Sequence, residues 1–278
     1  VVLDSLPQRR FTNSDLYVPV VIYIAGVIAY LSISYYLNDC VGLPLDDSYI
    51  HMVLARSIAD GAWFEFNPGQ PASGSTAPLY TLLLGLAYVF SGPGIYPSLI
   101  LGIIFGIGTI VYSVLLLREL IGTESDIIFG GVLIALSYPL VWGALSGMEI
   151  TLAAMLVLGG AYYFLRSFFD KKRLYISSIF FSAAILARPE SAVIAGIFYL
   201  YMLNKIGVRN IRILLLNAMI IASLPVLYAI INHHFTGAVL PNTFFAKTKG
   251  GTLESLMLGD YVRVLFNFTI RPIFNLIR

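Results

Sequence analysis

The chain has 278 residues, of which 58% are hydrophobic and only 12% are charged, and its mean hydropathy is +0.85. Soluble domains carry about 25% charged residues, so this composition excludes an ordinary soluble domain and indicates a polytopic membrane protein. The net charge of +2 gives no reason to expect a nucleic-acid partner, and the single cysteine, Cys40, excludes an intrachain disulfide.

Seven apolar stretches predict an all-α fold of membrane-spanning helices. They cover residues 17–37, 96–117, 126–142, 147–168, 174–188, 190–204 and 211–232. The first is too long for a signal-peptide core, so we expect it to be retained. Residues 174–204 could form one long helix, but the sequence Arg188-Pro189-Glu190 favours a hairpin. We treat residues 1–278 as a single transmembrane domain, and the natural chain could continue beyond Arg278.

An eighth apolar piece, residues 78–90, decides the topology. Pro78 and the sequence Gly92-Pro93-Gly94 enclose it, which leaves a helix of roughly 20 Å, whereas the hydrocarbon core is about 30 Å thick. We expect a juxtamembrane or re-entrant helix within a first external loop, residues 38–95. Every basic cluster then falls on one side, which the positive-inside rule makes cytoplasmic. These clusters are Arg9-Arg10, Arg118, 171–173 and 205–212.

The opposite side, external to the plasma membrane, collects the unusual polar features. They are Asp46-Asp47, Ser146-Gly147-Met148-Glu149, Arg188-Pro189-Glu190 and a later external loop, residues 233–260. This convergence favours a functional site on the external face, although solvated loops would give the same pattern. A transporter more often places ionisable groups near the bilayer midplane on two matching halves, and the sequence has no internal repeat.

Residues 47–60 predict an amphipathic helix with its apolar face toward the membrane. The apolar face would hold Ile50, Val53, Leu54 and Ile58, and the polar face Ser48, His51, Arg56 and Asp60. Asp46 or Asp47 would cap the helix and Gly61 would end it. Capping needs only one carboxylate, and two adjacent carboxylates repel unless a cation or a substrate proton is near.

Two further external segments allow more than one interpretation. Trp63, Phe64 and Phe66 suit either an interfacial anchor or the wall of a binding site. His233 and His234 would point apart on a helix, so we expect no metal site. Lys247 and Lys249 are either site residues or ordinary solvated lysines.

A carboxylate pair at the mouth of a membrane protein, with cations around it, suits transfer of a sugar from a polyprenyl-phosphate carrier. A carboxylate can accept the proton of the acceptor hydroxyl as general base. The departing phosphate needs no acid, only positive groups to stabilise its charge.

Several blocks of sequence carry a resemblance to a known family. The first is Asp46-Asp47-Ser48-Tyr49-Ile50, and the others cover residues 55–61, 66–70, 76–79, 146–149, 187–190 and 241–247. In this order they resemble the GT-C glycosyltransferases, especially the actinobacterial terminal arabinofuranosyltransferases. More distantly, the chain is similar to protein O-mannosyltransferases and lipid A aminoarabinose transferases. Val53 and Gln70 depart from the family pattern, which often has Arg and Glu at these places.

The resemblance implies an inverting transferase that takes a polyprenyl-phosphate sugar as donor and a glycan, lipid or protein as acceptor, with no cofactor and no metal. Asp46 would be the catalytic base, supported by Asp47. Substrate-binding roles would fall to Tyr49, Arg56, Glu149, Arg188, Glu190, His233, Asn242 and Lys247. A transporter or flippase of lipid-linked sugars and a non-catalytic membrane scaffold remain alternatives.

Overall fold

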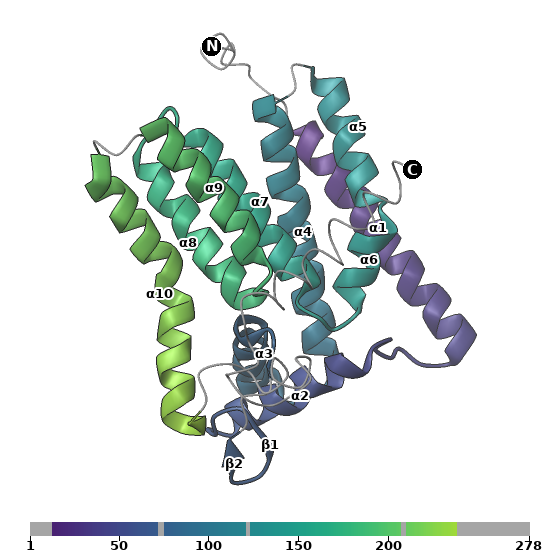
Figure 1. The fold of residues 1–278 in the computed structure, drawn as a ribbon. Helices are drawn as coiled ribbons and strands as arrows, with labels where there is room; N and C mark the ends of the chain where they lie inside the picture. Colours follow the sequence, from purple (N-terminus) through teal and green to yellow (C-terminus); the bar gives the residue numbers. More distant parts are fainter. Residues whose placement is uncertain (1–12, 72–74, 121–122, 207–209, 238–278) are drawn as a thin grey trace, which may run out of the picture.

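A computed structural model describes residues 13–71, 75–120, 123–206 and 210–237. These residues form ten helices and one two-stranded hairpin, so the fold is all-helical apart from that hairpin. Figure 1 shows α7, α8, α9 and α10 packed on one side of α4, with α1, α5 and α6 on the other side. The helices α2 and α3 and the hairpin form a layer at one end of this bundle.

Three helices are long and apolar enough to cross a membrane, which agrees with a membrane protein. They are α1 (Ser14–Asn38), α4 (Ile95–Leu120) and α10 (Ile211–Thr236). A fourth candidate is the pair α5 (Glu124–Ala135) and α6 (Tyr138–Leu145), which meet at a bend of 48°. Pro139 lies in the first turn of α6, where the missing backbone N–H of proline removes no helical hydrogen bond. A proline inside a continuous helix would remove one, so the helix is interrupted just before Pro139.

Three or four helices thus qualify as membrane spans by length and composition, which is fewer than the seven expected spans. The remaining expected spans are nevertheless helices: α7 (Ile150–Arg166), α8 (Lys172–Ala187) and α9 (Ser191–Ile206). Each has 16 or 17 residues, or roughly 24–26 Å of helix. The expected hairpin of α8 and α9 is confirmed, because the chain turns at residues 188–190 instead of continuing as one helix.

The short apolar piece, residues 78–90, forms a helix after which the chain is still at the same end of the bundle. This helix, α3 (Pro78–Ser91), starts with Pro78 in its first turn and stops at Gly92. Leu99, just inside α4, then packs with Leu43 and Leu145 in one buried cluster. Leu43 lies just before α2 (Asp46–Ala59), so α4 begins beside the α2 layer and α3 does not carry the chain to the other end.

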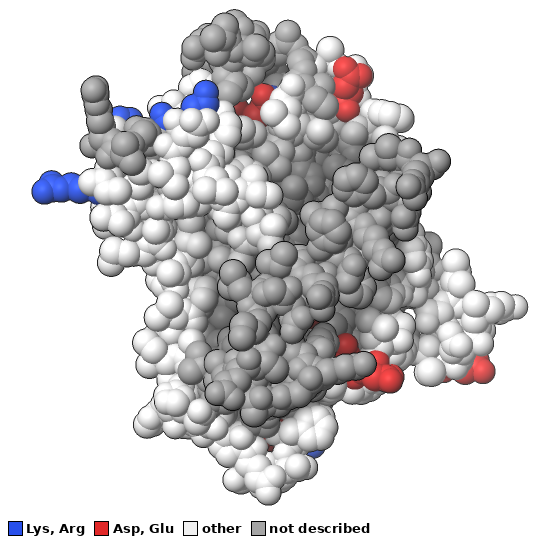
Figure 2. All heavy atoms as spheres, in the orientation of Figure 1, with Lys and Arg blue, Asp and Glu red and all other residues white. Residues whose placement is uncertain are grey.

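On the face drawn in Figure 2, the visible charged side chains lie toward the two ends of the molecule. At the end opposite α2, the buried carboxylate of Asp15 in α1 accepts hydrogen bonds from Arg118 in α4. Arg166 in α7 pairs with Glu119 of α4 at 3.0 Å. We call this end, with its short connections at residues 120–124, 166–172 and 206–211, the basic end.

Small residues allow the central helices to approach closely. A methyl group on Gly102 would lie 1.9 Å from the carbonyl oxygen of Ala144, and one on Gly106 would lie 1.9 Å from the Tyr23 hydroxyl. The Thr151 hydroxyl donates to the Gly102 carbonyl at 3.1 Å. Such contacts are typical of helices packed in membranes, where small residues and hydroxyls replace the hydrophobic effect between helices. They hold the start of α7 firmly against α4, which fixes the neighbouring turn that carries Glu149.

Candidate functional site

Part of the predicted polar face of α2 is buried in the protein. Ser48, His51, Leu54 and Ala55 are buried, whereas Ile50 and Val53 are exposed on the outside of the molecule. The expectation that Ser48 and His51 lie on an exposed polar face was therefore wrong, whereas the membrane-facing orientation of Ile50 and Val53 stays a prediction. In a membrane protein the outer surface can be apolar because lipid covers it, so the small and polar side of α2 is the side that packs against the protein.

The N-terminus of α2 also differs from the prediction. Leu45 occupies the capping position and no side chain caps the helix. Asp46 and Asp47 instead lie in the first helical turn, where the helix dipole favours negative charge. Both carboxylates are exposed. Gly61 has a φ of +85° just after the helix, as expected of a residue that ends it.

The first turn of α2 rests on the turn between α6 and α7. The buried Ser48 hydroxyl donates a short hydrogen bond to the carbonyl of Ser146. Gly147 has a φ of +73°, and a methyl group there would lie 2.8 Å from Leu43 and 3.1 Å from Ser48. Glycine is thus required twice, by the left-handed backbone and by the close approach of α2. The turn formed by Ser146-Gly147-Met148-Glu149 therefore packs against the first turn of α2, which carries Asp46 and Asp47.

Glu149 joins three segments that are far apart in the sequence. Its carboxylate lies 3.4 Å from Nε2 of His51 in α2 and, through its other oxygen, 3.4 Å from Nε of Arg188 at the end of α8. The side chains of His51 and Glu149 are only 4% and 5% exposed, and that of Arg188 is 43% exposed. Arg188 is also 3.8 Å from the exposed Glu190. The structure therefore brings Glu149, Arg188 and Glu190 together, as their sequence pattern suggested.

The backbone at Arg188 explains why its guanidinium reaches this place. Arg188 precedes Pro189, and a residue before proline is restricted to extended conformations. Its φ of −147° and ψ of 115° obey this rule and end α8 there. The helix stops at the level of Glu149, and the side chain extends toward the carboxylate.

His51 is held in a defined orientation. Its Nδ1 lies 2.9 Å from the Thr81 hydroxyl of α3, which donates to the carbonyl of Ala77 and lies 2.9 Å from the Ser75 hydroxyl. The Tyr80 ring meets the imidazole edge-on, with 5.5 Å between ring centroids. With Nδ1 facing Thr81, Nε2 must face Glu149, so α3 fixes the contact between α2 and Glu149.

Burial and charge act in opposite directions on Glu149. Desolvation by burial raises the pKa of its carboxyl, but the neighbouring His51 and Arg188 lower it more, so the net pKa is lowered. Oε2 has no hydrogen-bond partner among the described residues. The charged form is stabilised by His51, by the backbone at Glu149 and, to a smaller extent, by the Arg188 guanidinium.

Other predicted site residues lie apart from this cluster. Tyr49 is exposed, and Arg56 is exposed and pairs only weakly with Asp60 at 3.8 Å in the same helix. His233 is exposed near the end of α10, where its Nδ1 lies 3.0 Å from the Gly237 carbonyl oxygen. Asn242 and Lys247 lie outside the described residues, as does most of the predicted loop 233–260.

The aromatic residues after α2 fasten the hairpin of β1 (Glu65–Asn67) and β2 (Gln70–Pro71) to α10. Trp63 stacks on Phe235, with 5.2 Å between ring centroids, and Phe64 meets Tyr228 edge-on at 6.1 Å. Phe64 is fully buried, whereas Phe66 is half exposed. Two of the three aromatics therefore hold the loop against α10, and only Phe66 is open to a substrate or to lipid.

No metal centre is formed by the part of the chain that the structure describes: it contains no group of three or more His, Cys, Asp or Glu side chains that could hold an ion. Comparison of the chain with models of known protein families, with curated proteins and with solved structures gives no match.

Sequence reasoning placed His51 on the polar face of α2 but did not assign it to the site, and it missed Ser75 and Thr81 altogether. The spacing of Ser48, His51 and Ala55 could have identified the buried side of α2, since these residues lie one turn apart. Ser75 and Thr81 carried no such pattern. Their role depends on α3 packing beside α2, a tertiary contact that neither segment specifies alone.

Proposed function

We propose that this chain is a membrane glycosyltransferase of the GT-C type that transfers a sugar from a polyprenyl-phosphate donor to an acceptor hydroxyl. The observation that carries the proposal is the bridge from Glu149 to His51 and Arg188. It brings together two of the blocks that carry the family resemblance, 146–149 and 187–190, and joins them to His51, which directly follows a third block, 46–50, that begins with the exposed Asp46-Asp47 turn.

The topology that goes with this function has seven crossings. We propose that α1, α4, the bent pair α5 and α6, α7, α8, α9 and α10 all cross the plasma membrane, with the basic end in the cytoplasm. The shorter helices α8 and α9 would be completed at the external side by the α2 and α3 layer. This arrangement would place Asp46, Asp47 and Glu149 at the extracytoplasmic interface, where a lipid phosphate and a water-borne acceptor can meet.

In the proposed reaction the acceptor oxygen attacks the anomeric carbon of the donor sugar. Asp46 takes the hydroxyl proton as the new C–O bond forms. The bond between the anomeric carbon and the phosphate oxygen breaks, and the polyprenyl phosphate leaves with the bonding electrons and an additional negative charge. Attack from the side opposite the phosphate inverts the anomeric centre. Arg188, whose side chain is 43% exposed, is the described cation best placed to face the charge on the leaving phosphate.

The roles of the two acids differ in this proposal. Asp46 and Asp47 are exposed and free to meet substrate, whereas Glu149 is buried and engaged with His51 and Arg188. Glu149 thus acts as a positioning residue that fixes α2 and orients Arg188. Tyr49 and Arg56, on the outer side of α2, would contact the donor or acceptor at the rim.

A transfer assay tests the proposal. Purified protein in lipid nanodiscs is incubated with a panel of radiolabelled polyprenyl-phosphate sugars and a mixture of glycan and lipid acceptors, and label that leaves the carrier is measured. Transfer with inversion supports the function. In sealed vesicles, movement of the labelled lipid between leaflets without loss of the sugar would instead indicate a flippase. Neither transfer nor movement with any donor would favour a scaffold and would contradict the proposal.

A further inference from the structure

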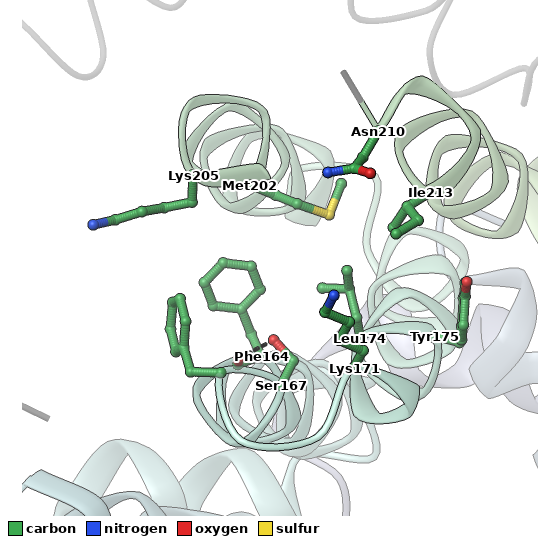
Figure 3. Close-up of a pocket in the computed structure, with 10 residues that line it drawn as sticks. Phe164, Ser167, Lys171, Leu174, Tyr175, Met202, Lys205, Asn210 and Ile213 are labelled. Carbon is green, nitrogen blue, oxygen red and sulfur yellow. Dashed lines mark hydrogen bonds between the residues drawn. The ribbon is translucent and has the colours of Figure 1, made fainter. Parts of the chain in front are cut away.

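A cavity of about 390 Å³ lies at the basic end, away from the Glu149 cluster. It opens between the ends of α7 and α9 and the starts of α8 and α10 (Figure 3). Its size falls within the range of about 300–1,000 Å³ that is typical of small-molecule sites. The reaction proposed above makes no use of it.

The inner walls of the cavity are apolar. Phe164, Leu174, Met202 and Ile213 line it, and the first three also border a narrow seam that continues between α8, α9 and α10. Leu174, Met202 and Phe164 are buried, and Phe164 meets Phe198 edge-on with 5.0 Å between ring centroids. These walls suit a hydrocarbon chain, whereas a small hydrophilic ion would leave them without a partner.

The mouth of the cavity is basic. Lys171 and Lys205 are among its lining residues, and none of the described lining residues is acidic. Lys171 projects over the opening, whereas the Lys205 side chain extends outward from the cavity wall (Figure 3), and its ammonium lies 5.7 Å from the centroid of the Tyr201 ring. Lys172 and Arg173 follow directly, and the nearby Asp170 is paired with Arg173 at 3.4 Å. The local charge is therefore positive.

We propose that this cavity binds one anionic phospholipid from the leaflet that surrounds the basic end. The phosphate lies at the mouth beside Lys171, where Lys205 adds positive charge from the outer edge, and one acyl chain lies against the apolar walls formed by Phe164 and Met202. Basic pockets between membrane helices are suited to anionic headgroups, with each lysine near the surface contributing about a factor of five in affinity. The site is separate from the proposed donor site, because the two lie at opposite ends of the bundle (Figure 1).

Native mass spectrometry of the detergent-purified protein tests this inference. Titration with phosphatidylglycerol should give one tightly held adduct, and phosphatidylcholine with the same acyl chains should bind at least about tenfold more weakly. The double variant Lys171→Ala, Lys205→Ala should lose roughly 10- to 30-fold in affinity for phosphatidylglycerol. Lys172→Ala is the matched control, because Lys172 is exposed beside the cavity but does not line it.

Three outcomes would overturn the proposal. The first is equal binding of both lipids, and the second is an equal loss of affinity in Lys172→Ala. The third is a lysine-dependent doubling of the protein mass, which would show that a second copy occupies the cavity. An arm with millimolar inorganic phosphate separates the lipid from its headgroup alone: displacement of the adduct by phosphate would show that the apolar walls do not contribute. Met202→Trp, which fills the cavity, should also remove the adduct without altering the lysines.

Discussion

Nε2 of His51 lies 3.4 Å from Oε2 of Glu149, and both side chains are almost completely buried. This contact connects the helix that carries Asp46 to the turn that begins α7. Because Arg188 approaches the other oxygen of Glu149, one buried carboxylate sets the relative positions of α2, α7 and the end of α8. The geometry around the exposed Asp46 therefore depends on residues that need not touch a substrate.

Removal of the Glu149 charge should loosen this end of the molecule. Glu149→Gln keeps the shape of the side chain but leaves His51 and Arg188 without their carboxylate, which we expect to cost about 1–3 kcal/mol. The thermal unfolding midpoint in detergent measures the loss. Glu190→Gln is the control, since that side chain is 77% exposed and its replacement should change stability by less than about 0.5 kcal/mol. Equal effects of the two variants would refute the positioning role of Glu149.

Glu149 should also give stability a dependence on acid pH. Its pKa is lowered in the folded protein, so the unfolded chain takes up the proton more readily than the folded chain. The contribution to stability is complete above the ordinary value of 4.5 and is lost as the pH falls through the lower folded pKa. Unfolding midpoints measured from pH 7 down to pH 3 should therefore fall more for the wild type than for Glu149→Gln. Parallel curves would show that Glu149 does not titrate as described.

Gly147 should not tolerate a side chain. Alanine there would force a left-handed backbone, at about 1–2 kcal/mol, and would push its methyl group against Leu43 and Ser48. We expect Gly147→Ala to increase proteolysis within residues 46–60 and to reduce activity. Gly42→Ala is the matched control, because a methyl group at Gly42 meets nothing within 4 Å and the residue has no positive φ. If residues 46–60 of Gly147→Ala resisted proteolysis as well as those of the wild type, the close packing described for this turn would be contradicted.

At the basic end, replacing one partner of the Asp15–Arg118 ion pair should destabilise the protein more than replacing both partners. Arg118→Met leaves the fully buried carboxylate of Asp15 without its guanidinium, and we expect a loss of about 3–5 kcal/mol. The double variant Asp15→Leu, Arg118→Met replaces both charges with apolar groups, and most of that stability should return. Unfolding midpoints of the two variants and the wild type give the comparison. If the double variant were no more stable than Arg118→Met, the ion pair would stabilise the fold by more than the mutual compensation of its two charges.

Asp46 carries the sharpest functional prediction. Asp46→Asn keeps the size of the side chain but removes the base, so transfer should fall by at least about 100-fold while donor binding persists. Asp39→Asn is the control, because Asp39 is exposed at the same end and has a φ of 55°, a conformation that asparagine also tolerates. Turnover near that of the wild type in Asp46→Asn would remove Asp46 from the role of base.

The positions of the helices could be predicted from the sequence because apolar runs and breakers mark them directly. Pro78 and Gly92 bound α3, Pro189 separates α8 from α9, and the structure follows each signal. Whether a helix of 16 residues crosses a membrane could not be predicted in the same way. That property depends on the tertiary packing around the ends of the helix, which the sequence of the helix alone does not specify.

The sequence was enough to predict that Glu149 and Arg188 belong to the site, but it was not enough to predict how they are arranged against α2. Glu149 and Arg188 stood out because charges are rare in this chain, and the structure places them 3.4 Å apart. Ser48 and His51 were expected on an exposed polar face, but both are buried against the protein, whereas Ile50 and Val53 lie exposed on the outer surface. His51 was therefore not recognised as the partner of Glu149, and Thr81 could be found only once α3 was seen beside α2.

The stacking of Trp63 on Phe235 gives the molecule a natural optical reporter. Trp63 is one of only two tryptophans in the chain, and its ring lies against the last turns of α10. In a Trp142→Phe background, the emission wavelength and quenching of this single indole would follow the separation of the 62–71 loop from α10. The loop joins α2 to α3, so the opening and closing of this end of the protein could be timed by stopped-flow fluorescence without attaching a dye.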